Sequence, residues 1–82
     1  MAVQQDVTRA IDLALAEQWD DAHTIAQANE GHPLADWLHA ILHRIEGDES
    51  NARYWYRQAK RDPAAYPNAS VELMAIKAAC TG

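Results

Sequence analysis

The four histidines of this 82-residue chain are its side chains best suited to chemistry, and two of them are four positions apart. On a helix, His39 and His43 would lie one above the other, where their imidazoles can bind one metal ion. Zinc takes three or four protein ligands, so His23 is a candidate third ligand, with Asp36 or Glu46 as further candidates. Whether His23 approaches His39 depends on how two helices cross, which the sequence leaves open.

Four of these residues, together with three on the next helix, also predict a surface for a protein partner. A polar strip lies opposite the apolar stripe of the third expected helix and consists of Asp36, His39, His43 and Glu46. Tyr54 projects from the polar side of the next helix, unlike its apolar neighbours Trp55 and Tyr56. The predicted partner-binding residues are Asp36, His39, His43, Glu46, Arg53, Tyr54 and Arg57.

Catalysis has little support in the sequence. Ser50 and Ser70 lie near expected helix starts, where hydroxyls act as caps, and neither belongs to a G-x-S-x-G turn. Ala40 follows His39, so the zinc-protease motif H-E-x-x-H is absent. Cys80 is the only cysteine, which excludes an internal disulfide and a multi-cysteine zinc site. We therefore expect no enzyme, no catalytic residue and no cofactor; zinc or another divalent transition metal belongs to the alternative hypothesis.

Five amphipathic helices must position these residues. Apolar side chains recur every three or four positions over residues 3–17, 20–30, 33–46, 48–60 and 68–81. The expected N-caps are Asp20, Asp48 and either Asn68 or Ser70, and Pro33 suits the first turn of the third helix. Gly31 and Gly47 are placed to end the second and third helices.

The short links between these helices predict an all-α fold of stacked antiparallel hairpins. We expect one domain over residues 1–82, with hairpins at 3–31 and 33–62 and a terminal capping helix at 68–81. Alanine supplies 17 of the 82 residues, and small side chains let helices approach closely. The expected close contacts are at Ala10, Ala22, Ala26, Ala40, Ala52 and Ala59.

Charge and hydropathy limit the partners. The net charge of −5 argues against nucleic-acid binding. The sequence contains no 18-residue apolar run and no export signal, so we expect a cytoplasmic protein without membrane contact. Residues 1–46 hold eight acids and two bases, whereas the fourth helix gathers Arg53, Arg57 and Lys60, with Arg61 beside it. This asymmetry favours an acidic partner or head-to-tail contact between copies of the chain.

A 30-residue shift aligns the two expected hairpins, pairing Asp6 with Asp36, Ala10 with Ala40 and Pro33 with Pro63. The spacing of Ala40, Gly47, Ala52, Tyr56 and Ala59 resembles the signature of the tetratricopeptide (TPR) and Sel-like helical repeats. The match covers residues 34–63; in residues 4–33, Glu17 stands where the turn glycine belongs.

The strings W-x-H-A-x-L-H-R, E-G-D and N-A-x-Y-W-Y also resemble a group of small proteins for which the resemblance implies no activity. The TPR resemblance implies a helical-hairpin fold that binds proteins or peptides. The leading hypothesis is therefore a protein- or peptide-interaction module that can form a homo-oligomer. The alternative is a metal-binding protein or metal-dependent enzyme that uses His23, His39 and His43.

Overall fold

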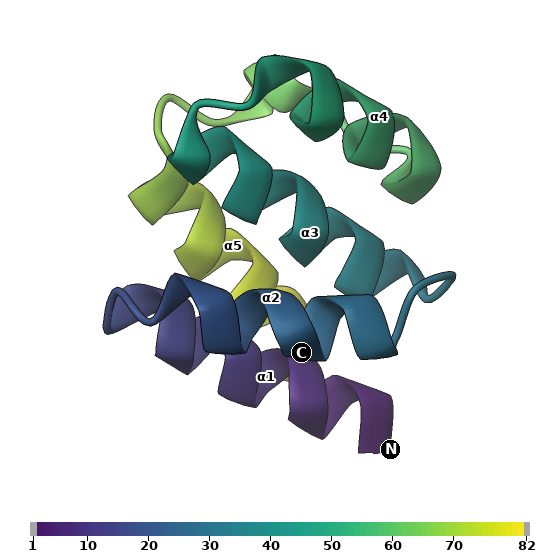
Figure 1. The fold of residues 1–82 in the computed structure, drawn as a ribbon, viewed down its shortest axis with the longest axis vertical. Coiled ribbons are helices and arrows are strands. Elements are labelled where there is room, and N and C mark those ends of the chain that lie inside the picture. The colour runs from purple at the N-terminus through teal and green to yellow at the C-terminus, as the bar shows by residue number, and fades with distance from the viewer. Residues whose placement is uncertain (1, 82) are drawn as a thin grey trace.

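The computed structural model describes residues 2–81 and contains five α-helices (Figure 1). These are α1 (Ala2–Leu15), α2 (Trp19–Ala28), α3 (Pro33–Glu46), α4 (Glu49–Ala59) and α5 (Ala69–Thr81), with a 3-10 turn, η1, at Pro63–Ala65. No strand occurs within this described range, so the predicted all-α class is confirmed. None of the described helices is both long and apolar enough to cross a membrane.

Helix α3 is the centre of the fold. Helices α1 and α2 form one antiparallel hairpin and α3 and α4 form another, as the short links predict. Helix α3 packs against α1, α2, α4 and α5, while α5 contacts α1 and α3 behind the hairpins (Figure 1). Because neighbours surround α3 on several sides, its polar side chains are drawn into the interior along with its apolar ones.

The turns of the two hairpins are built alike, 30 residues apart. The Glu17 and Gly47 amides each bond to the carbonyl three residues back, at 3.0 and 3.1 Å. The following amides, of Gln18 and Asp48, each bond to the carbonyl five residues back, both at 2.9 Å. Both turns require a left-handed residue, with φ of 64° at Glu17 and 81° at Gly47. The two turns therefore share one helix-ending motif, even though glutamate replaces glycine in the first. The same pair of backbone bonds ends α4 at Lys60 and Arg61, so the 30-residue repeat stays a prediction.

The predicted caps are confirmed at two helices. Asp48 Oδ1 accepts from the Asn51 amide at 3.4 Å, and Asn68 Oδ1 accepts from the Val71 amide at 2.9 Å. Helix α3 has an unexpected cap, because the ring Nδ1 of His32 accepts from the Leu34 amide at 3.2 Å.

The cap predicted for α2 is wrong. Its N-cap is Gln18, two residues earlier, and the helix begins at Trp19, which places Asp20 in the first turn, where its charge favours the helix dipole. Both helices of the first hairpin are also shorter than expected, ending at Leu15 and Ala28. The left-handed Glu17 explains the first of these ends, since the α-helix cannot continue through it.

Alanines let the helices pack closely, as predicted. Each of the six alanines expected at helix contacts is buried: Ala10, Ala22, Ala26, Ala40, Ala52 and Ala59. The large rings of Trp37 and Tyr56 fill the remaining space and are almost fully buried. In this core, methyl groups permit close backbone approach, and the bulk comes from these two rings together with buried aliphatic side chains such as Ile11, Leu38 and Ile41.

A buried carboxylate joins α5 to the second hairpin. Glu72 is 0% exposed and accepts hydrogen bonds from Tyr56 Oη at 2.6 Å, Trp37 Nε1 at 2.8 Å and Arg44 Nη1 at 2.8 Å. Arg44 also donates from Nη2 to the Tyr66 carbonyl at 3.1 Å. Burial and the hydrogen bond to Glu72 raise the pKa of Tyr56. The amphipathic pattern of residues 68–81 gives no sign of this polar network.

Candidate metal centre

Three histidines converge where α2 crosses α3. One ring nitrogen each of His23, His39 and His43 can be chosen so that all lie within 4.8 Å of one another. Ring centroids are 4.5 Å apart for His23 and His39, and 5.0 Å for each of the other two pairs. Among residues 2–81, this is the only set of three or more metal-ligating side chains arranged so closely. The crossing that the sequence left open thus places His23 against His39.

The pair on α3 is stacked by the helix itself. His39 and His43 are one helical turn apart, and their rings lie at an interplanar angle of 16°. On its other side His39 stacks on Trp55 of α4, with centroids 4.0 Å apart and the same angle. His39 is consequently 3% exposed and His43 9% exposed. The sequence placed Trp55 on an apolar stripe, but its role as a cover over His39 depends on how α4 packs on α3.

The cluster is held by a hydrogen bond between imidazoles. His23 Nε2 lies 2.7 Å from His39 Nε2, so one of these nitrogens donates and the other accepts. Burial, together with repulsion from charge on His23 and His43, lowers the pKa of His39 to about 4. His39 is therefore neutral at neutral pH, which is the form that binds metals.

Two buried nitrogens in the cluster lack hydrogen bonds. They are His39 Nδ1 and His43 Nδ1. The nearest carboxylate oxygens to His43 Nδ1 are Glu46 Oε1 at 3.3 Å and Asp48 Oδ2 at 3.9 Å, without hydrogen-bond geometry. Hydrogen bonds from Asn51, with a smaller effect of His43, lower the pKa of Asp48, which keeps this carboxylate ionised.

The predicted polar strip on α3 does not face solvent, and that expectation is wrong for three of its four residues. His39 and His43 lie beneath His23 and Trp55. Asp36 is 5% exposed, and its Oδ1 accepts from the Gly31 amide at 3.0 Å, so it holds the α2–α3 turn instead of joining the histidines. Of the strip, only Glu46 is exposed.

The predicted partner residues on α4 do lie on the surface. Arg53 and Arg57 are exposed, and Tyr54 is 47% exposed. The Tyr54 and Trp55 rings are perpendicular to each other, with their centroids 5.1 Å apart. Arg61 instead covers an aromatic ring, its guanidinium carbon lying 3.9 Å from the Trp37 ring centroid. The outer face of α4 is thus available to a partner, and its partner-binding role stays a prediction.

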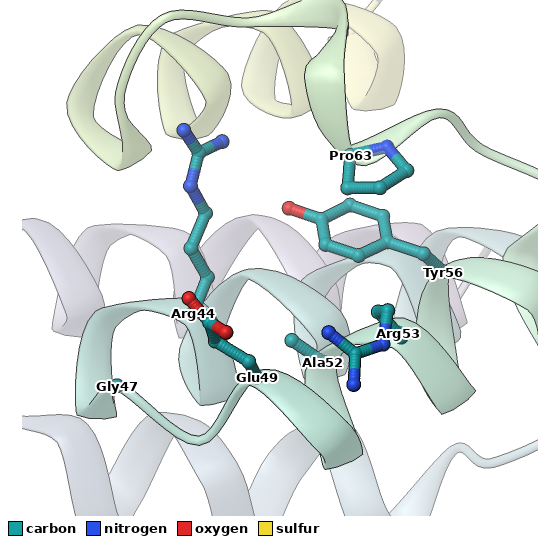
Figure 2. Close-up of a pocket in the computed structure, with 7 residues that line it drawn as sticks. All are labelled: Arg44, Gly47, Glu49, Ala52, Arg53, Tyr56 and Pro63. Carbon is teal, nitrogen blue, oxygen red and sulfur yellow. The ribbon is translucent and has the colours of Figure 1, made fainter.

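A separate pocket of about 340 Å³ opens between α4, the α3–α4 turn and η1. Figure 2 shows Arg44 reaching up beside Tyr56 toward α5, Pro63 over the tyrosine ring, and Glu49 and Arg53 projecting from α4. Arg44 and Tyr56 already donate to the buried Glu72. The inner polar groups of this pocket thus serve the fold, which leaves the histidine cluster as the stronger candidate site.

Comparison of the chain with family models, with curated proteins and with solved structures finds no match. The TPR and Sel-like resemblance therefore stays a prediction. Over residues 2–81 the structure itself shows a small all-helical protein of five helices, without a family assignment.

Proposed function

We propose that this protein binds one divalent transition-metal ion through His23, His39 and His43. The observation that supports this proposal is the convergence of three imidazoles, two of them buried, with ring nitrogens within 4.8 Å of one another. Burying two imidazoles and leaving His39 Nδ1 and His43 Nδ1 without hydrogen bonds costs stability. A metal ion held by the ring nitrogens that face one another would offset this cost, while the two Nδ1 atoms would stay outside its coordination.

The distances require only a small adjustment for metal binding. Zinc–nitrogen bonds of about 2.0–2.1 Å in a tetrahedral site place two ligand nitrogens about 3.3 Å apart. The His23 and His39 nitrogens, at 2.7 Å, would have to separate slightly, and the widest pair in the cluster would have to approach. His23 is only partly buried, so its ring has the freedom to make this adjustment.

The ligand set indicates the class of metal. Imidazole suits zinc, copper, nickel and cobalt, whereas magnesium and calcium prefer oxygen ligands. Three protein ligands leave a tetrahedral ion one position for water or for an exchangeable ligand. This ligand set supports a protein that stores, carries or senses a transition metal.

Zinc titration of untagged, chelator-treated protein tests the proposal. We expect calorimetry to give one zinc ion per chain, and His23→Gln to lose most of the zinc affinity while retaining the helical circular dichroism spectrum. The matched control is His32→Asn, which changes the histidine outside the cluster and keeps an N-cap acceptor for α3. The proposal fails if the native chain binds no zinc, or if His23→Gln binds it as well as His32→Asn does.

The outer face of α4 supports a second candidate function, the binding of another copy of this chain. Arg53 and Arg57 are exposed beside Tyr54, and the first half of the sequence is strongly acidic. Opposite charges favour a head-to-tail contact, which salt weakens. Sedimentation velocity over a range of concentrations should show self-association at low salt, reduced by Arg53→Glu combined with Arg57→Glu. A chain that stays monomeric at high concentration excludes this function.

A further inference from the structure

The turn after α3 brings two carboxylates to one side of the histidine cluster. Gly47 is left-handed, and the Asp48 amide bonds back to the carbonyl of His43 at 2.9 Å. This backbone bond returns the chain toward His43, so Asp48, the N-cap of α4, lies close to the last turn of α3. Glu46 lies three residues after His43 on that last turn, which places it on the same side of the helix.

Both carboxylates approach one particular nitrogen. Glu46 Oε1 is 3.3 Å and Asp48 Oδ2 is 3.9 Å from His43 Nδ1. That nitrogen is buried and lacks a hydrogen-bond partner. Two negative groups favour the tautomer in which Nδ1 carries the proton, because an N–H is attracted to a carboxylate and a lone pair is repelled. His43 Nε2 then keeps its lone pair for a metal ion.

The two carboxylates are held differently. Asp48 Oδ2 accepts from the Asn51 side chain at 2.7 Å, and its Oδ1 caps the Asn51 amide, so its position is fixed by α4. Glu46 is the more adaptable of the two, because its exposed side chain has no second anchor among the contacts described. A small rotation of Glu46 would convert its 3.3 Å approach into a hydrogen bond with His43.

We propose that Glu46 and Asp48 are positioning residues that fix the tautomer and orientation of His43 as a metal ligand. This inference rests on the proposed metal-binding function. Histidine ligands in metal sites commonly donate their second ring nitrogen to a carboxylate, which orients the ring and strengthens the bond to the metal. The same carboxylates place negative charge near a divalent ion that three neutral imidazoles would leave uncompensated.

The double variant Glu46→Gln with Asp48→Asn tests this proposal. Both changes preserve side-chain size, and asparagine retains the N-cap of α4. We expect zinc affinity to fall by about 10- to 100-fold, the usual effect of losing outer-shell partners. The matched control is Glu49→Gln, which neutralises the adjacent exposed carboxylate in the first turn of α4 and should leave zinc affinity unchanged.

A second readout examines His43 without metal. Nitrogen-15 NMR of the metal-free native chain should show His43 protonated at Nδ1, and the double variant should shift this ring toward the Nε2-protonated form. Unchanged zinc affinity together with an unchanged tautomer would overturn the positioning role. If the native chain binds no zinc, the metal-binding function fails, whereas the tautomer measurement still decides whether these carboxylates set the state of His43.

Discussion

His23 Nε2 of the first hairpin lies 2.7 Å from His39 Nε2 of the second. In the metal-free protein this contact requires one proton between the two ring nitrogens, so one ring donates from Nε2 and the other accepts there. A metal ion bound to both rings would move that proton to the far nitrogen of its own imidazole. The same two atoms can therefore join the hairpins through a proton or through a metal.

The metal-free protein should lose stability as the pH falls from about 6.5 to about 4. The folded state lowers the pKa of His39 from its usual 6.5 to about 4, because burial and neighbouring histidines disfavour its charged form. Within this window the unfolded chain binds the proton more readily, so acid favours unfolding. The loss should reach up to about 3 kcal/mol for this group.

Chemical denaturation at pH 7, 6 and 5, with a chelator present, measures this effect. The variant His39→Gln should show a weaker dependence on pH, because it removes the titrating group while keeping a polar side chain. His32→Asn is the comparison, since His32 is a cap outside the cluster. Equal pH dependence in His39→Gln and His32→Asn would contradict the assignment to His39.

Neutralising Glu72 should destabilise the fold. Glu72→Gln weakens the bonds from Arg44, Tyr56 and Trp37 and leaves the Arg44 charge without its partner. Breaking such a pair costs about 3 kcal/mol. Thermal unfolding followed by tryptophan fluorescence reports the change, with the exposed Glu49→Gln as a near-neutral control. Equal midpoints for the two variants would show that the buried network contributes little.

Substitutions at the left-handed residues of the two equivalent turns should have opposite effects on stability. Glu17→Gly should stabilise the protein by about 1 kcal/mol, since a left-handed backbone strains every residue except glycine. Gly47→Ala should cost a similar amount for the same reason, although no atom lies within 4 Å of the added methyl position. Urea denaturation measures both. Destabilisation by Glu17→Gly would mean that its side chain contributes more than the backbone strain costs.

Sequence periodicity was sufficient to predict the helices, the antiparallel hairpins and the alanine contacts. It also placed His39 and His43 on one strip, because a spacing of four residues fixes their relation within a helix. The left-handed turn at residue 17 was indicated only by its alignment with Gly47. These features depend on local geometry, which a sequence expresses directly.

Contacts between different helices were harder to predict from the sequence. The strip on α3 was expected to face solvent, because an amphipathic pattern does not show that His23 and Trp55 would cover its polar side. Glu72 was overlooked because a single acid within an apolar run gives no indication of its three donors. Such sites depend on helix crossings that bring together residues 16 to 35 positions apart.

X-ray absorption spectroscopy of the one-to-one zinc complex tests the metal site most directly, because it identifies the atoms bound to the ion. We predict nitrogen ligands at about 2.0–2.1 Å with the outer-shell scattering of three imidazoles, reduced in His23→Gln. A spectrum dominated by oxygen ligands, without imidazole scattering, would contradict the assignment of His23, His39 and His43 as a metal centre.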